Sequence, residues 1–246
     1  MKTWIRTLIE RSGYVIHRAP AHRFDAMDAA LRALQANGYR PRVVIDGGAN
    51  RGQWFGLASA IFRDSEFHEI EPQSECWPAL EAAAAARGRT SVHRTVITAP
   101  GITSVGMHRG GDQLSTGAFV IQAQDDFATD LRTPATTLDE LMLPHVQAGD
   151  RALLKLDLEG HEIEALRGAA GLLKRLEAIV CEVSFFDVND AGRPRFGDVM
   201  TFLEARDFML FDFASLHPRL SDGRLWLGDA VFIRRGTPLV ASNRRD

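Results

Sequence analysis

The sequence predicts an α/β fold: a Rossmann-like, seven-stranded, mostly parallel sheet that ends in an antiparallel hairpin. Between residues 42 and 188, apolar strand-like segments alternate with helical segments. This alternation indicates parallel strands joined by crossover helices on both faces of the sheet. The last two strand-like segments, 208–214 and 225–235, are separated only by a short polar stretch. Because a parallel pair needs a long crossover, these two strands are expected to pair antiparallel.

Composition excludes little. The chain has 246 residues, 45% of them apolar and 25% charged, and a formal net charge of −3. These values are typical of a globular domain and give no overall attraction to nucleic acid, so no nucleic-acid partner is expected. Cys76 and Cys181 lack the spacing of a metal site. We interpret both as reduced core thiols, as in a cytoplasmic protein.

Residues 1–40 are interpreted as a helical extension packing on a core domain of residues 41–240. Charged residues interrupt the apolar positions of residues 1–20, so no signal peptide is expected. Residues 1–18 carry apolar residues at helical spacing among basic ones: Trp4, Ile5, Leu8 and Ile9. Such a helix can pack on its own domain or lie on an anionic membrane surface. A peripheral contact with the inner face of the membrane therefore remains an alternative.

In the first half of the core, each strand prediction is followed by a helix. Gly38 and Gly88 suit helix ends, and the alanine run before Gly88 favours helix. Helices are predicted over 24–38, 53–62 and 74–88, and strands over 42–48, 66–72 and 90–98.

Residues 99–135 break this rhythm. They are rich in Gly, Ser, Thr and Asp without a helical period, and we interpret them as an inserted loop or hairpin over the carboxyl edge of the sheet. Residues 108–119 within them can close over a polar acceptor or be a plain hairpin turn. The alternation then resumes with a short helix, 136–143, where Thr137 and Glu140 have capping-box spacing. It continues with strands at 151–160 and 178–188 and helices at 162–176 and 197–207.

The first strand runs into a glycine-rich turn, "DGGANRG", at residues 46–52. In a doubly wound sheet the ligand binds beyond the carboxyl ends of the strands, at the position of this turn. Gly48 and Gly52 allow close approach of a ligand, and Asn50 tolerates left-handed geometry. Asp46 ends the strand within reach of a cationic group such as an amine. A turn needed only for tight packing is the alternative.

Glu71 ends the second strand, in "HEIEP". An acid at this position is placed to accept both ribose hydroxyls of an adenosine cofactor. A surface acid at a strand end is the alternative. NAD and S-adenosylmethionine (SAM) share this ribose, so Glu71 does not distinguish them.

A second polar cluster, "KLDLEGHE", spans residues 155–162. Asp157 is expected where the fourth strand ends, facing the same cleft, with Glu159, His161 and Glu162 close behind. Lys155 points to one face of a buried strand, where a charge needs a carboxylate partner, and Glu182 is a candidate. These residues can also form a purely structural ion-pair network.

Five blocks together carry a family resemblance: "VVIDGGANRGQW", "EIEPQSE", "TTLDEL", "LLKLDLEGHEIEALRGA" and "IVCEV". In this order and spacing, over about residues 43–185, they resemble the FkbM-type family of SAM-dependent methyltransferases, which has the class I methyltransferase fold. Ile70 and the alanine run depart from the family pattern at the expected adenine pocket. The resemblance implies SAM as cofactor, bound by Asp46, Gly48, Asn50, Gly52 and Glu71, with Asp157 and Glu159 bordering the reaction centre.

The resemblance also implies the reaction: transfer of a methyl group (the EC 2.1.1 class) to a hydroxyl of a sugar, glycan, glycolipid or glycosylated natural product. N-methylation occurs in a few members. Asp157 and His161 are the candidate general bases, and His108 and His217 have weaker support. No metal site is favoured; if a divalent cation is present, Asp157 and Glu182 are its expected ligands. An NAD-dependent oxidoreductase, which the hairpin disfavours, and a non-catalytic SAM-binding module remain alternatives, and the sequence does not give the oligomeric state.

Overall fold

A computed structural model of the chain describes residues 27–108, 119–120, 132–187 and 192–240. The predicted amphipathic helix of residues 1–18 and most of the 108–119 loop lie outside these ranges. Within them, no helix has the length and apolar character needed to cross a bilayer.

The main sheet has seven strands in the order β10-β11-β9-β8-β1-β2-β3. Neighbours from β3 through β9 pair parallel, whereas β11 pairs antiparallel with both β9 and β10. This confirms the predicted mostly parallel sheet with its terminal antiparallel hairpin. The strands are β1 (Val43–Gly47), β2 (Glu66–Ile70), β3 (Thr90–His93), β8 (Ala152–Leu156), β9 (Leu176–Ser184), β10 (Phe208–Pro218) and β11 (Leu225–Arg234).

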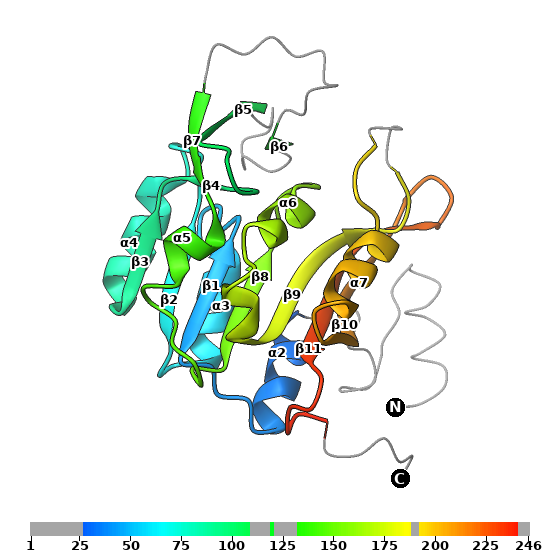
Figure 1. Cartoon of the computed structure of the whole chain (residues 1–246), viewed down its shortest axis with the longest axis horizontal. Helices are drawn as coiled ribbons and strands as arrows, with labels where there is room; N and C mark the ends of the chain where they lie inside the picture. The colour runs from blue at the N-terminus through cyan, green and yellow to red at the C-terminus, as the bar shows by residue number, and fades with distance from the viewer. Residues whose placement is uncertain (1–26, 109–118, 121–131, 188–191, 241–246) are drawn as a thin grey trace, which may run out of the picture.

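Helices cover both faces of this sheet (Figure 1). One face packs against α2 (Met27–Ala36) and α3 (Gln53–Ile61), with Ala83 of α4 (Trp77–Arg87) at its margin. The other face packs against α5 (Leu138–Met142), α6 (Glu162–Arg167), the 3₁₀ turn η1 (Leu172–Lys174) and α7 (Phe196–Glu204). The apolar strand residues alternate between these two cores, as expected for a sheet buried on both sides.

A small four-stranded sheet, in the order β4-β7-β5-β6, stands at one end of the main sheet, at the top of Figure 1. Its strands are β4 (Val96–Ile97), β5 (Ser104–His108), β6 (Phe119–Val120) and β7 (Arg132–Thr136). The single strand predicted over 90–98 is therefore wrong. The chain leaves the main sheet after His93 and pairs with β7 instead. The inserted region contains paired strands, which agrees with the hairpin alternative for residues 99–135.

Two further predictions concern helix ends. The capping box is confirmed: the Thr137 hydroxyl accepts from the Glu140 amide at 3.0 Å, and the Glu140 carboxylate accepts from the Thr137 amide. The helix predicted over 162–176 instead breaks after Arg167. A Cβ on Gly168 would lie 2.2 Å from the Thr98 carbonyl oxygen, so the chain passes too close to β4 for a side chain there.

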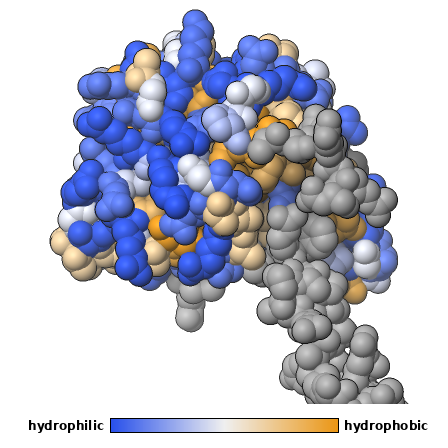
Figure 2. All heavy atoms as spheres, turned by 90° about the horizontal axis from the view of Figure 1, so that it is seen from below, coloured by the Kyte–Doolittle hydropathy of each residue, from blue (hydrophilic) through white to orange (hydrophobic). Residues whose placement is uncertain are grey.

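Two further features are those expected of a globular domain: the cysteines are in the core, and the described surface seen in Figure 2 is mostly hydrophilic. Cys76 and Cys181 are buried in the core, as predicted. Figure 2 views the molecule from below relative to Figure 1, and the described surface on that side is mostly hydrophilic with smaller apolar areas.

Candidate active site

A cavity of about 260 Å³ lies at the carboxyl ends of β1, β2 and β8. The turn after β1 and the end of β2 form one wall, and the segment after β8 forms another. Residues of β4, β5 and β6 also line it, so the small sheet covers part of the opening. Of the predicted site residues, the lining includes Gly48, Asn50, Glu71, Asp157, Glu159 and His161.

The turn after β1 brings the backbone close to β8. Gly48 has φ +78°, and a Cβ there would lie 2.0 Å from the carbonyl oxygen of Asp157. The Gly48 and Ala49 amides both donate to the Ile70 carbonyl, at 3.0 and 3.1 Å. Asn50 has φ +48°, which confirms the predicted left-handed geometry. The turn therefore ties together the ends of β1, β2 and β8 around the cavity.

Gly52 shapes this turn without lining the cavity. It has φ +87° at the N-cap of α3, and its amide donates to the Ala49 carbonyl at 2.9 Å. Its predicted contact with a cofactor has no support in the cavity geometry.

Glu71 is fixed by the same turn. One carboxylate oxygen accepts from the Asn50 amide at 2.7 Å and the other from the Gln73 amide at 2.8 Å. Burial raises the pKa of Glu71, and these two hydrogen bonds oppose the rise. Each carboxylate oxygen has two acceptor sites, so the group retains capacity for two hydroxyl donors.

Asp46 has a different environment from the one predicted. It is fully buried, does not line the cavity, and forms an ion pair with Lys155 at 3.0 Å. Across the β1–β2 pair it faces Glu69, whose pKa is raised to about 10 by burial first and by Asp46 second. This shift favours the protonated form of Glu69 beside Asp46. Direct contact between Asp46 and a cofactor amine is disfavoured because the carboxylate already neutralises a buried ammonium group.

Lys155 joins Asp46 to the cavity. Its ammonium group also lies 3.4 Å from the Asp157 carboxylate and donates to the Gly48 carbonyl at 3.0 Å. Burial alone lowers the pKa of Lys155, but the two carboxylates outweigh it and raise the pKa above its usual value. The predicted partner Glu182 is wrong, since Asp46 and Asp157 occupy that role.

Asp157 begins the loop before α6, and its amide donates to the Gly47 carbonyl at 3.1 Å. Its side chain is 40% exposed, so the carboxylate faces the cavity and solvent. Glu159 follows in left-handed geometry, φ +54°, and its carbonyl accepts from the Arg193 guanidinium. The loop thus presents two acids at the cavity edge.

Glu162 supports this loop from within. Its Oε1 accepts from the amides of Leu158, at 2.8 Å, and Gly160, at 3.2 Å. Burial raises the pKa of Glu162 to about 7, and the backbone hydrogen bonds oppose the rise. Glu162 therefore has a structural role, because its carboxylate holds the backbone of the loop.

His161 lines the cavity and is 7% exposed. Its Nε2 is 2.9 Å from the Thr98 hydroxyl. Its Nδ1 is buried and has no hydrogen-bond partner among the described residues. Burial lowers the pKa of His161 to about 4, so the imidazole is neutral at pH 7. The other two histidines considered, His108 and His217, do not line the cavity.

Glu182 lies away from the cavity lining, on β9 opposite Asp229 of β11. Its pKa is raised well above the usual value, first by burial and then by the charge of Asp157. Within the described ranges, neither Asp157 nor Glu182 belongs to a group of three possible metal ligands. Metal dependence at this site remains a prediction to test.

Two residues were missed in the sequence analysis. Trp54, in the first turn of α3, lines the cavity, and its buried Nε1 has no hydrogen-bond partner among the described residues. The Thr98 hydroxyl forms the hydrogen bond with His161 Nε2, although the two residues are 63 positions apart in the chain. The position of Trp54 directly after the glycine turn was an available signal for the first, but nothing in the sequence links Thr98 to His161.

The sequence matches the methyltransferase FkbM domain over residues 46–210, which is more than half of the chain. The chain belongs to this family. The match confirms the resemblance found in the sequence and makes the chain a methyltransferase with the class I fold. No curated protein matches the chain.

Solved structures with a similar overall arrangement include two methyltransferases. Precorrin-6y C5,15-methyltransferase from Geobacter metallireducens GS-15 is 11% identical, with a TM-score of 0.45 and coverage of 84% of this chain and 88% of the other. The 1,6-didemethyltoxoflavin-N1-methyltransferase from Burkholderia thailandensis, bound to 1,6-didemethyltoxoflavin and S-adenosylhomocysteine, is 17% identical. Its TM-score is 0.40, with coverage of 85% of this chain and 77% of the other.

Proposed function

We propose that the chain is a SAM-dependent O-methyltransferase acting on a hydroxyl of a sugar, glycan or glycosylated small molecule. One observation carries the proposal. The same cavity joins Glu71, a buried carboxylate able to accept two hydroxyls, to a loop that presents Asp157 and His161. A carboxylate suited to a ribose and two candidate bases therefore line one cavity at the switch point of a doubly wound sheet.

The cavity residues suit SAM. Gly48 lets the turn after β1 lie directly against the Asp157 backbone at the cavity wall, and Glu71 can accept the ribose hydroxyls. Ile70 and Ile97 supply apolar contact for an adenine. The Nε1 of Trp54, which has no hydrogen-bond partner in the described part of the chain, can donate to a cofactor carboxylate. When bound, SAM supplies a methyl group on a sulfonium whose departure leaves a neutral thioether.

A sugar hydroxyl must lose its proton to attack a methyl group efficiently. His161 is the proposed general base. When the proton of its neutral ring is on Nε2, donated to the Thr98 hydroxyl, Nδ1 carries the lone pair and has no hydrogen-bond partner among the described residues. Because Nδ1 is buried, a small rotation of the ring would bring it to the acceptor hydroxyl. Asp157 would position the hydroxyl beside it, held in turn by Lys155. General-base assistance of this kind accounts for about 10²–10⁴-fold in rate.

The saccharide class rests on the family resemblance together with the two acids, Asp157 and Glu159, at the cavity edge. Carboxylates are suitable acceptors for the several hydroxyl donors of a sugar. The test is methyl transfer from labelled SAM to panels of saccharides, nucleotide sugars and glycolipids, with amines as a second panel. Labelled O-methyl ethers support the proposal, and labelling confined to the amines contradicts it.

Two variants test the assignment of the base. His161→Asn is expected to lower kcat by about 10²–10⁴-fold while SAM still binds. His217→Asn removes an exposed histidine outside the cavity and should change neither. With His161 as base and a pKa near 4, the acidic limb of kcat/KM should lie near pH 4. A limb that persists at the same pH in His161→Asn assigns the base to another group.

A further inference from the structure

A group of imidazole and carboxylate side chains lies on the α5 face of the main sheet, apart from the cavity. It consists of Glu66 and His68 on β2, His93 on β3 and His145 just after α5. None of the four lines the cavity at the carboxyl ends of the strands. Glu66 is the first residue of β2, whereas Glu71 of the candidate active site follows the last. We call these four residues the histidine cluster.

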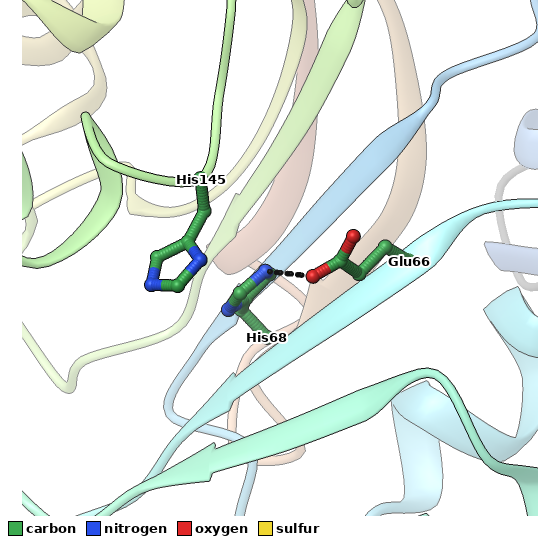
Figure 3. A group of neighbouring side chains, drawn as sticks. All are labelled: Glu66, His68 and His145. Carbon is green, nitrogen blue, oxygen red and sulfur yellow. Dashed lines mark hydrogen bonds and ion pairs between the residues drawn. The ribbon is translucent and has the colours of Figure 1, made fainter.

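Three members of the cluster converge on one point. His68 lies between Glu66 and His145 (Figure 3), with its Nε2 3.2 Å from Glu66 Oε1. The rings of His68 and His145 have centroids 4.6 Å apart. One ligand atom from each of the three residues can be chosen so that all lie within 4.8 Å of one another. Two ligands bound to one tetrahedral Zn²⁺ at 2.0–2.1 Å lie about 3.3–3.4 Å apart, close to the His68–Glu66 distance.

To bind one ion, the three side chains must move closer together, and the exposed side chain of His145 can make this movement. His68 is fully buried in the sheet and Glu66 is partly exposed, and strand β2 fixes the backbone of both. The His145 ring is exposed, although its backbone is held by donation from its amide to the Met142 carbonyl at 3.0 Å. Rotation of that ring toward His68 would complete three ligands around one ion.

His93 supplies the support that a metal-binding histidine needs. Its Nε2 lies 3.0 Å from His68 Nδ1, and the two rings stack at 15°. If the Nε2 of His68 binds a metal, its Nδ1 carries the proton and donates to His93.

We propose that Glu66, His68 and His145 form a binding site for a divalent transition-metal ion, with Zn²⁺ as the best match. Two imidazoles and one carboxylate form an established Zn²⁺ ligand set, and water would complete the tetrahedron. The ion would link β2 to the segment after α5. It would lie near the start of β2, whereas Glu71 follows the end of this strand. Its role is to stabilise the fold and not to take part in methyl transfer. The site is independent of the function proposed above.

The test measures Zn²⁺ binding to the untagged full chain, since a histidine tag would bind the ion itself. After equilibration with Zn²⁺ and removal of the excess, elemental analysis should find one Zn²⁺ per chain in the wild type. His145→Ala changes an exposed ring, and Glu66→Gln changes a partly exposed carboxylate, so both are expected to fold. Each should lose the bound ion, and the rise in Tm on Zn²⁺ addition should disappear with it.

Two further variants separate a site from general attraction of Zn²⁺ to histidine. His217→Ala removes an exposed histidine outside the cluster and should keep one Zn²⁺ per chain. His93→Ala should weaken binding by about 10–100-fold without abolishing it, because His93 orients a ligand and is not one. No bound Zn²⁺ in the wild type, or equal binding by the wild type and His145→Ala, would overturn the proposal.

Discussion

The close approach of Gly48 to Asp157 is the contact that brings the glycine turn and the end of β8 together. Gly48→Ala places a Cβ 2.0 Å from the Asp157 carbonyl oxygen, at φ +78°. The left-handed conformation alone costs an alanine about 1–2 kcal/mol. Overpacking against a neighbouring backbone adds about 1–3 kcal/mol. The variant should therefore lose about 2–5 kcal/mol of unfolding free energy, and its affinity for SAM should fall at least about tenfold, a change of about 1.4 kcal/mol.

Gly101→Ala is the matched control. Gly101 has φ +84°, but a Cβ there would meet nothing within 4 Å. It should lose only the conformational part, about 1–2 kcal/mol, and bind SAM normally. Urea unfolding gives both free energies by linear extrapolation, and isothermal titration gives both affinities. Equal losses of stability in the two variants, with unchanged SAM binding in both, would refute the proposed contact between the turn and β8.

Two other predictions concern buried charge. Asp46→Ala should destabilise the fold by about 3 kcal/mol in urea unfolding, because Lys155 loses a buried partner. Asp222→Ala, at an exposed ion pair, should cost far less. A similar small loss in both variants would remove Asp46 from the core of the site. Burial lowers the pKa of His161 from 6.5, its ordinary value in the unfolded chain, to about 4 in the folded chain. As the pH falls from 6.5 to 4, the imidazole therefore takes up a proton in the unfolded chain and not in the folded one. The unfolding free energy should fall over that window by at most about 3 kcal/mol, and subtracting the His161→Asn curve should isolate this slope; parallel curves would contradict the buried neutral ring.

Sequence patterns were sufficient for the main sheet because its signals are local. The hairpin followed from the short link between the last two strands, and the left-handed Asn50 followed from the glycine turn. Glu71 was located by its position at a strand end. Each of these inferences needs only a few neighbouring residues and the geometry of a parallel sheet.

The inferences that failed required contacts between distant segments. Lys155 was known to need a carboxylate, but Asp46 and Glu182 lie on the two sides of β8 in the folded sheet order and only the structure distinguishes them. Gly168, just after the break that follows Arg167, lies against Thr98, a segment far away in the chain. The histidine cluster joins two strands to the segment after α5, so no spacing rule in the sequence identifies it.

The central claim is that Glu71 binds the ribose of a SAM-type cofactor in this cavity. The most direct measurement is isothermal titration of S-adenosylhomocysteine and of NAD⁺ into the wild type, Glu71→Gln and Glu75→Gln. Glu75 is an exposed acid in the same segment and serves as the control. S-adenosylhomocysteine should bind one per chain to the wild type and Glu75→Gln, and at least about tenfold more weakly to Glu71→Gln, while NAD⁺ should not bind. Binding of NAD⁺ alone, or equal S-adenosylhomocysteine affinity in all three proteins, would contradict the claim.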